Sequence, residues 1–255
     1  MVQGPTALVA GIVTFASFFG IAATNLHPAT PWVVIGVTTL WIIIQSLPRV
    51  YLHPADYMNK RLSLADLDKM LLDIPRVGLM GSSSVGKSTF LSRVSHFEGP
   101  SQETEAPYAV IVALPDQNKG KYIALIDTVG RKYPSASQVI SDSDAVIVFL
   151  DNSSRSGDEL IASNRMKMHR EIVASNITPS LEVAEKCKYV LVLVNKADLW
   201  GGNSKSCLKM SRFANEIRDQ LSSAIPGKII EILDNHSNLN GSAVSAVLRR
   251  VGEKI

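Results

Sequence analysis

The sequence has no Asp, Glu, Lys or Arg in its first 48 residues, although the chain has 255 residues in all. All 26 basic and 23 acidic residues follow this stretch, and the formal net charge is +3 at pH 7. This uneven distribution predicts an uncharged N-terminal segment followed by one soluble domain of ordinary charge density. Because the positive excess is small and no block of Lys or Arg occurs, no nucleic acid is expected as a partner.

Cysteine and histidine are also scarce. The two cysteines, Cys187 and Cys207, cannot build a disulfide scaffold, and no Cys-x-x-Cys pair occurs. The five histidines lack the spacing of zinc ligands. Hydrophobic residues make up 46% of the chain, which excludes intrinsic disorder. A folded domain without a disulfide framework or a zinc site is therefore expected.

The N-terminal segment instead contains two long apolar runs, at about residues 5–24 and 31–47. A helix needs about 20 mostly apolar residues to cross a bilayer, and both runs come close to that length. Basic residues begin at Arg49 and are absent between the runs, so the positive-inside rule places the rest of the chain in the cytosol. We therefore expect residues 1–48 to be a membrane anchor, formed by a transmembrane hairpin.

Other interpretations of this anchor remain open at the level of the sequence. One run could span while the other forms a re-entrant or interfacial segment, or both could form a buried hairpin in a soluble fold. A cleaved signal peptide would need a positively charged start, which this chain lacks. The expected location is an integral membrane protein of the ER membrane or a bacterial inner membrane, two cases that the sequence does not distinguish.

Residues 49–75 are predicted to be a linker that carries one short amphipathic helix. Within it, the stretch from Ser63 to Asp66 has the pattern of a capping box, which starts a helix by pairing a side chain with a free backbone N–H group. This helix has one apolar stripe and is expected to pack on the domain that follows. The domain itself is expected to comprise residues 76–255.

A phosphate-binding loop begins this domain. The apolar strand 76–80 runs into G-x-x-x-x-G-K-[ST], and a helical pattern follows from Lys87. Glycines let successive N–H groups point at phosphate oxygens, Lys87 neutralises the β- and γ-phosphates, and the Ser88 hydroxyl is a ligand for Mg²⁺. The expected nucleotide-binding residues of this loop are Gly81, Ser82, Ser83, Ser84, Val85, Gly86, Lys87, Ser88 and Thr89.

A second apolar strand, 121–126, ends in Asp127-Thr-Val-Gly130. An Asp at a strand end can hold Mg²⁺ through water, and the N–H group of Gly130 can contact the γ-phosphate. D-x-x-G is common in turns, but its position after a phosphate loop favours the metal-binding interpretation.

A third strand, 189–194, ends in Asn195-Lys-Ala-Asp198. This N-K-x-D pattern resembles the guanine-reading motif of the Ras-like and translation-factor-like (TRAFAC) P-loop small GTPases. The Asp198 carboxylate can accept from guanine N1–H and N2–H₂ together, a donor pattern that adenine lacks. Asn195 would tie the loop to the phosphate loop, and the stem of Lys196 would cover the base.

Further apolar stretches complete the pattern. Residues 109–114 and 121–126 are predicted to pair as a hairpin, 144–150 and 228–233 to be strands, and 242–251 to be the last helix. Strands that alternate with helices indicate the α/β class. We expect a doubly wound, mostly parallel sheet with one antiparallel edge, preceded by the transmembrane hairpin.

The resemblance implies roles for residues that no pattern fixes. Thr104 would be the switch threonine that closes on Mg²⁺ and the γ-phosphate, since it is the only Thr between Thr89 and Asp127; a solvated loop residue is the alternative. Arg131 stands near the place of a Gln that orients water, so hydrolysis is expected to be slow. Arg131 would either act as an arginine finger or be an exposed switch residue. The expected catalytic residues are Lys87, Thr104, Gly130 and Arg131; the expected metal ligands are Ser88, Thr104 and Asp127.

Two functions remain in competition. One is a membrane-anchored GTPase that uses GTP, GDP and Mg²⁺ and presents its GTP-loaded switches, 101–107 and 130–140, to a protein partner. The other is a GTP-binding scaffold with little or no hydrolysis. In architecture the chain is similar to the β subunits of the signal recognition particle receptor, which are membrane-anchored GTPases, although those usually have a single anchor. No residue of the closing loop 234–241 receives a site role, although Ser237 or Asn235 could offer an N–H group to guanine.

Overall fold

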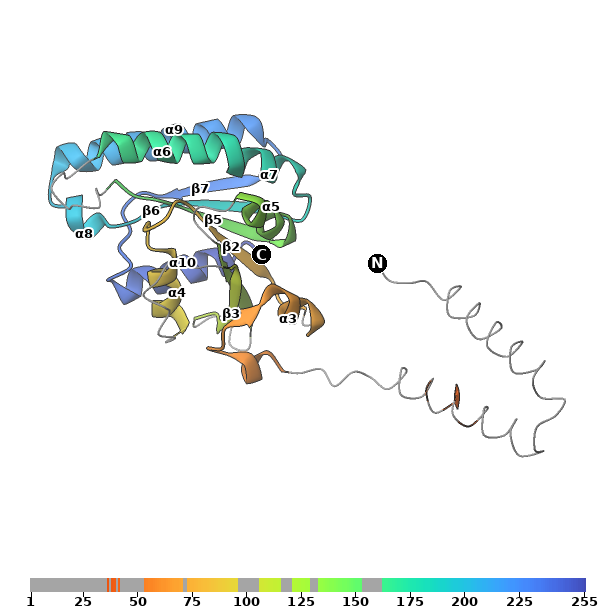
Figure 1. Ribbon diagram of the computed structural model, residues 1–255. Coiled ribbons are helices and arrows are strands. Elements are labelled where there is room, and N and C mark those ends of the chain that lie inside the picture. Colours follow the sequence, from red (N-terminus) through yellow and green to blue (C-terminus); the bar gives the residue numbers. More distant parts are fainter. Residues whose placement is uncertain are drawn as a thin grey trace. The chain divides into compact units, whose positions relative to one another are not determined.

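The computed structural model describes residues 53–70, 73–95, 106–115, 121–128, 133–152 and 162–255, together with Gly36, Thr38, Thr39 and Trp41. The chain divides into two compact units, Met1–Tyr51 and Leu52–Ile255, and the fold below belongs to the second (Figure 1). The predicted spans lie outside the described residues except for those four, which are helical. Among the described residues, no helix combines the length and the apolar character that crossing a bilayer requires.

Strands and helices alternate along the second unit, as its sequence predicts. The elements are η2 (Pro54–Tyr57), β1 (Leu62–Ser63), α3 (Leu64–Lys69), β2 (Arg76–Met80), α4 (Lys87–Ser95), β3 (Tyr108–Ala113), β4 (Tyr122–Asp127), α5 (Tyr133–Asp142), β5 (Ala145–Leu150), α6 (Ser163–Ile172), η4 (Val173–Ile177), α7 (Thr178–Val183), β6 (Tyr189–Val194), α8 (Ala197–Trp200), α9 (Ser204–Ala224), β7 (Ile229–Leu233) and α10 (Gly241–Gly252).

The described strands form one sheet in the order β1-β3-β4-β2-β5-β6-β7. From β4 to β7 all neighbouring strands are parallel, whereas β3 pairs antiparallel with both β4 and β1. The central strands β5 and β6 are buried at every residue, because a parallel sheet is covered on both faces and its strands are therefore apolar throughout. The α/β class and the hairpin of β3 and β4 are confirmed.

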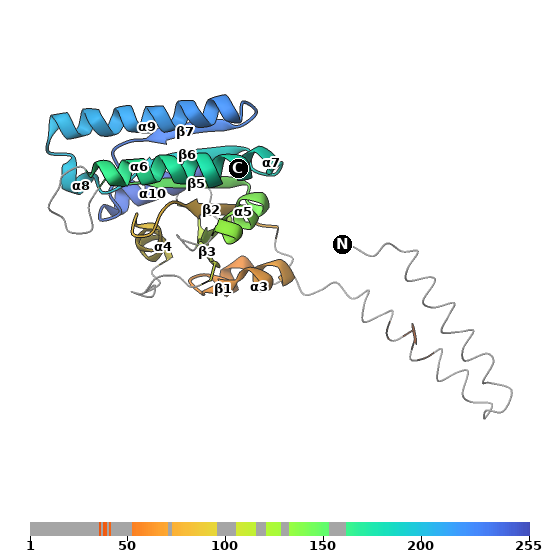
Figure 2. The ribbon, with the colours of Figure 1, turned by 45° about the horizontal axis from the view of Figure 1, so that its top comes forward.

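Helices cover both faces of the sheet and make three layers (Figures 1 and 2). Side chains of α5, α6, α7 and α9 share one core with one face, and those of α4 and α10 share a second core with the other. Strand β5 shows why: Val146 and Val148 enter the first core, while Ile147 and Phe149 enter the second, since successive side chains of a strand point to opposite faces.

The compact unit begins earlier than the sequence-based boundary at residue 76. Leu62 of β1 and Leu67 of α3 belong to the first core, and β1 pairs with β3. Ser63 caps α3 as expected, because its hydroxyl oxygen accepts from Asp66 N. The second contact differs from a capping box, since the Asp66 carboxylate accepts from the Ser63 hydroxyl and not from a backbone N–H group. Strand β1 has only two residues, which is too few for the alternating pattern of a strand to be visible in the sequence. The sequence therefore predicted a linker here.

Candidate functional site

The phosphate loop joins β2 to α4, and β2 lies between β4 and β5 in the sheet. Its backbone turns through left-handed conformations at Gly81 (φ +134°), Ser84 (φ +64°) and Gly86 (φ +100°). A Cβ atom on Gly81 would lie 2.6 Å from the carbonyl oxygen of Phe149, and one on Gly86 would lie 2.7 Å from Asn238 Nδ2. Both positions therefore require glycine, for conformation and for space.

Lys87 lies over this loop and is only 5% exposed. Its ammonium group donates to the carbonyl oxygens of Gly81 (2.8 Å) and Ser82 (3.0 Å). Burial lowers the pKa of Lys87, and the nearby carboxylate of Asp127 opposes that shift. A cation held at a helix N-terminus beside a loop of this shape is suited to bind phosphate.

Ser88, the next residue of α4, meets the end of β4. Its hydroxyl donates to Asp127 Oδ2 at 2.7 Å, and Asp127 is fully buried. Hydroxyl and carboxylate oxygens are the hard ligands that Mg²⁺ prefers, so this pair fits the metal that the sequence predicts. Next to it, the Thr128 hydroxyl donates to Leu79 O at 2.7 Å and fastens the end of β4 to β2.

Tyr108 of β3 is a residue of this region that the sequence did not single out. It lies opposite Asp127 in the register of β3 and β4 and is 2% exposed. Burial, followed by the charge of Asp127, raises the pKa of Tyr108 to about 12. The Arg61 guanidinium lies 4.1 Å from the centre of its ring. The phenol is therefore neutral and can contribute only as a hydrogen-bonding group.

The N-K-x-D loop follows β6 and contacts the phosphate loop directly. Asn195 Nδ2 donates to Val85 O at 2.8 Å, which is the link that the sequence assigned to this residue. Asn238, after β7, adds two further contacts: its N–H group donates to Asn195 Oδ1 (3.2 Å) and its Nδ2 to Gly86 O (2.7 Å). Sequence reasoning missed Asn238, since no pattern marks this residue.

Asp198, the expected guanine-reading residue, is exposed and accepts a short hydrogen bond from the Ser237 hydroxyl. Ser237 thus contacts the site through its side chain, whereas the sequence suggested only its backbone N–H group for such a contact. Lys196 has a left-handed backbone (φ +66°), which turns the chain between β6 and α8. The carboxylate that is expected to read the base is therefore accessible, and a neighbouring hydroxyl holds it.

The structure brings most of the expected site residues to one edge of the sheet and leaves three unplaced. Thr104, Gly130 and Arg131 lie outside the described residues, so their expected roles remain predictions. The site residues that the structure places at the carboxyl ends of β2, β4 and β6 are Gly81, Ser82, Ser83, Ser84, Val85, Gly86, Lys87, Ser88, Thr89, Asp127, Asn195, Lys196 and Asp198. Parallel strands put their carboxyl ends at one edge, so these loops meet.

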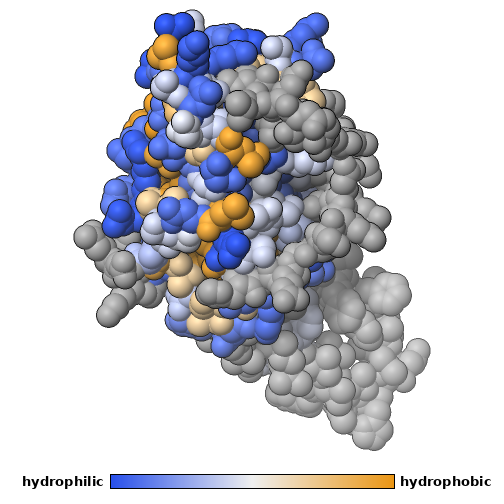
Figure 3. Space-filling model, turned by 90° about the vertical axis from the view of Figure 1, so that its left-hand side faces the viewer, coloured by the Kyte–Doolittle hydropathy of each residue, from blue (hydrophilic) through white to orange (hydrophobic). Residues whose placement is uncertain are grey.

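The surface in this part of the molecule is mixed in character. Figure 3 shows the side of the molecule where α8 lies in Figure 1, and on it separate hydrophobic residues lie among hydrophilic ones.

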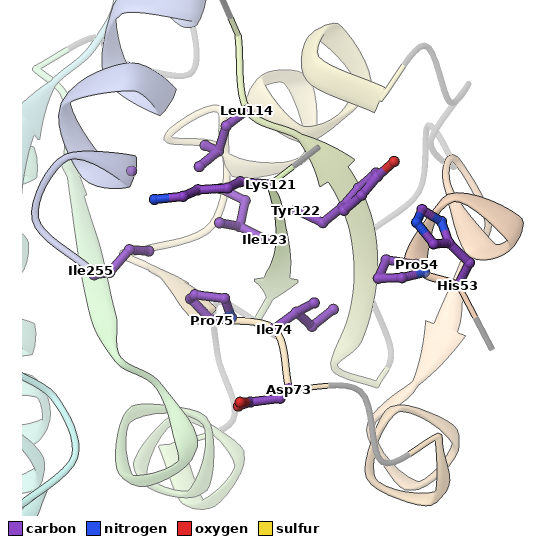
Figure 4. A pocket seen from close by; sticks show the side chains of 11 residues that line it. His53, Pro54, Asp73, Ile74, Pro75, Leu114, Lys121, Tyr122, Ile123 and Ile255 are labelled. Carbon is purple, nitrogen blue, oxygen red and sulfur yellow. The ribbon is translucent and has the colours of Figure 1, made fainter. Parts of the chain in front are cut away.

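A cavity of about 370 Å³ lies at the opposite edge of the sheet, where Pro75 precedes β2. Figure 4 shows Leu114, Lys121 and Ile255 around this cavity. It is separate from the phosphate loop, because the two lie at opposite ends of β2.

The chain is similar to known proteins in sequence and in fold. A family model described as "50S ribosome-binding GTPase" matches residues 76–217. A chain of the mammalian SRP receptor is 17% identical with a TM-score of 0.51, over 69% of this chain and 99% of that one. The bacterial selenocysteine-specific elongation factor EF-Sec is 14% identical with a TM-score of 0.48, over 71% of this chain and 28% of that one. The chain thus spans about 28% of that factor's length. No curated protein sequence matches.

Proposed function

This chain belongs to the family of P-loop GTPases described as 50S ribosome-binding GTPases, and from this premise we propose that it is a membrane-anchored GTP-dependent switch. Membership of the family establishes a GTP-binding domain of the TRAFAC type, and its general activity is hydrolysis of GTP to GDP and phosphate. The proposal adds the anchor, the cytosolic location and a protein partner that binds the GTP-loaded switches.

The observation that carries the nucleotide assignment is the contact between the two loops. Asn195 holds the guanine motif against the phosphate loop through Val85 O, so one ligand can occupy both. A guanine base at Asp198 and phosphates at Lys87 are the two ends of such a ligand. Adenine would leave the carboxylate of Asp198 without the paired donors that it requires.

Each residue of the site has a defined task in this function. Lys87 offsets phosphate charge, and the loop presents N–H groups to phosphate oxygens. Ser88 and Asp127 would hold Mg²⁺, which when bound supplies positive charge that stabilises the developing phosphate charge. Arg131 lacks an acceptor that could orient the attacking water, so we expect slow turnover unless another group supplies that function.

Binding of GTP and ATP to the full chain in detergent tests the base assignment. Displacement of a fluorescent GDP analogue should require far less GTP than ATP. Asp198→Asn should abolish this preference, since an amide cannot accept both guanine donors, whereas Asp219→Asn on the exposed surface of α9 should retain it. Equal displacement by ATP and GTP in the unmodified chain would refute the function.

The second candidate is a GTP-binding scaffold with little or no hydrolysis, and Arg131 next to Gly130 is the feature that favours it. Single-turnover hydrolysis, with and without membranes, separates the two candidates. The switch is supported by release of phosphate at a rate above that of free GTP. The scaffold is supported by stable bound GTP that still promotes capture of the same partner.

Membrane anchoring and location are tested separately. The proposed two spans, 5–24 and 31–47, predict that the full chain resists extraction by alkaline carbonate and that a variant lacking residues 1–48 is released. In sealed vesicles whose cytosolic side faces outward, protection of the GTPase domain from added protease would contradict its proposed cytosolic location.

The proposed partner is tested by pull-downs from detergent extract. GTP-loaded protein should recover a partner that GDP-loaded protein does not.

A further inference from the structure

A buried carboxylate lies between the two loops of the nucleotide site. Asp151 follows directly after β5, and β5 lies between β2, which precedes the phosphate loop, and β6, which precedes the guanine motif. Asp151 is fully buried. An isolated buried carboxylate would cost several kcal/mol, so its surroundings must hold it charged or neutralise it.

Cationic side chains from helix α6 and from the loop between β6 and α8 contact this carboxylate. Arg165 of α6 donates from Nε to Asp151 Oδ1 at 2.6 Å, and Lys196 Nζ lies 2.6 Å from Asp151 Oδ2. His169, one turn further along α6, lies 3.0 Å from Oδ1 through Nε2. Burial by itself raises the pKa of Asp151, but the hydrogen bonds from His169 and Arg165 outweigh it and hold that pKa well below its usual range.

The second arm of Arg165 reaches the phosphate loop. Its terminal nitrogen donates to the carbonyl oxygen of Ser83 at 2.7 Å, while the side chain is 14% exposed. An unbroken series of contacts therefore leads from Ser83 through Arg165 and Asp151 to Lys196. Arginine suits this place because its planar fork serves two acceptors at fixed angles.

We propose that Asp151 and Arg165 are positioning residues that fix the phosphate loop and the guanine motif relative to each other. The inference rests on the proposed function, since it concerns the same nucleotide site. A nucleotide gains from both loops only if they are held at the spacing that it spans, so a preformed spacing reduces the entropy lost on binding. Asn195 links the loops on one path, and this charged cluster links them on a second.

The effect expected of the cluster is on the residence time of the nucleotide and not on the choice of base. Asp198 selects the base, and neither Asp151 nor Arg165 carries that task. Removing the fork of Arg165 should therefore raise the dissociation rates of GDP and GTP by similar factors, about tenfold or more, because charge-assisted hydrogen bonds are lost. The ratio of GTP to ATP affinity should stay the same.

Arg170 offers a matched control on the same helix. It also forms two hydrogen bonds to an acceptor, from Nε to Glu216 Oε1 (2.6 Å) and from its terminal nitrogen to Glu216 Oε2 (2.8 Å), but this pair is exposed. Arg165→Gln and Arg170→Gln therefore change the same residue type in α6 and remove a similar number of contacts. Arg165→Lys keeps the charge and can replace only one of the two contacts, so its rate should be intermediate.

The experiment measures dissociation of a fluorescent GDP analogue from the full chain in detergent, together with its melting temperature without nucleotide. We expect fast release from Arg165→Gln, intermediate release from Arg165→Lys, and release from Arg170→Gln within about twofold of the unmodified chain. If the Arg165 and Arg170 variants release nucleotide equally, or if Arg165→Gln alters the preference for GTP over ATP, the inference is wrong.

The variants of Arg165 decide the outcome even if Asp151→Asn, which removes a fully buried charge, fails to fold. Where Asp151→Asn does fold, its nucleotide release should be as fast as that of Arg165→Gln, and unchanged release would also contradict the inference. An unmodified chain that binds ADP as well as GDP would instead refute the proposed function. The two failures are therefore distinguishable.

Discussion

The Ser88 hydroxyl donates a hydrogen bond to Asp127 Oδ2 at 2.7 Å, although the two residues are 39 positions apart in the chain. Ser88 lies in the first turn of α4, and Asp127 is the last residue of β4. The two meet because β2 pairs in parallel with β4, with Leu79 opposite Asp127. The sheet order thus creates the pair of oxygen ligands that a magnesium ion would use.

Ser88→Ala should weaken GTP binding about tenfold in the presence of Mg²⁺, because the hydroxyl ligand is lost. In excess chelator the variant and the unmodified chain should bind GTP alike, and titration calorimetry measures both conditions. Ser95→Ala removes a hydroxyl of the same helix that donates to Leu91 O, so it should leave the effect of Mg²⁺ unchanged. A Ser88 variant with a normal response to Mg²⁺ would contradict the assigned ligand.

Gly86→Ala should lower the free energy of unfolding by about 1–3 kcal/mol and abolish tight nucleotide binding. The reason is the left-handed backbone (φ +100°) together with the side-chain nitrogens of Asn195 and Asn238 that a Cβ atom would meet. Gly227→Ala is the control, since no atom lies within 4 Å of its Cβ position. Urea unfolding and GDP displacement test both variants, and equal stability of the two would show that the loop tolerates a side chain.

Leu67→Ala should lower the free energy of unfolding by about 2–5 kcal/mol, because Leu67 is 2% exposed and belongs to the first core, which it shares with side chains of α5, α6, α7 and α9. Leu208→Ala on the outside of α9, where the side chain is 54% exposed, should change stability by less than about 0.5 kcal/mol. Chemical denaturation compares the two. A cost at Leu67 as small as that at Leu208 would mean that α3 is a dispensable linker.

Stability should fall as the pH drops from about 7.5 to about 5.5. Burial lowers the pKa of His169, so the folded protein keeps this ring neutral while the unfolded chain takes up a proton below about pH 6.5. The unfolded state then binds more protons, which reduces the free energy of unfolding as the solution becomes more acidic. Urea unfolding at the two pH values measures this slope.

His169→Gln should make that slope shallower than in the unmodified chain. Some dependence should remain, because burial lowers the pKa of His236 in the same way. The double variant with His236→Gln should be flatter still. A slope that neither substitution changes would show that other groups cause the acid sensitivity.

Local patterns were enough to predict the phosphate loop. Gly81 and Gly86 adopt the positive φ angles that the glycine pattern implies, and α4 begins at Lys87 as expected. The predicted strands were also found, because continuous apolar runs leave little choice in a sheet covered on both faces. Strand β1 was missed, since its two residues carry no periodicity.

The amino-acid sequence by itself determined which side chains have the chemistry for a nucleotide: a lysine and a serine after a glycine loop, and a carboxylate after Asn195. Only the tertiary structure decided which other groups support them. Arg165 contacts Ser83, and Asn238 contacts Gly86, across 82 and 152 positions of the chain. Such partners are brought together by the order of strands in the sheet, and strand order depends on packing between distant segments, which no local pattern records.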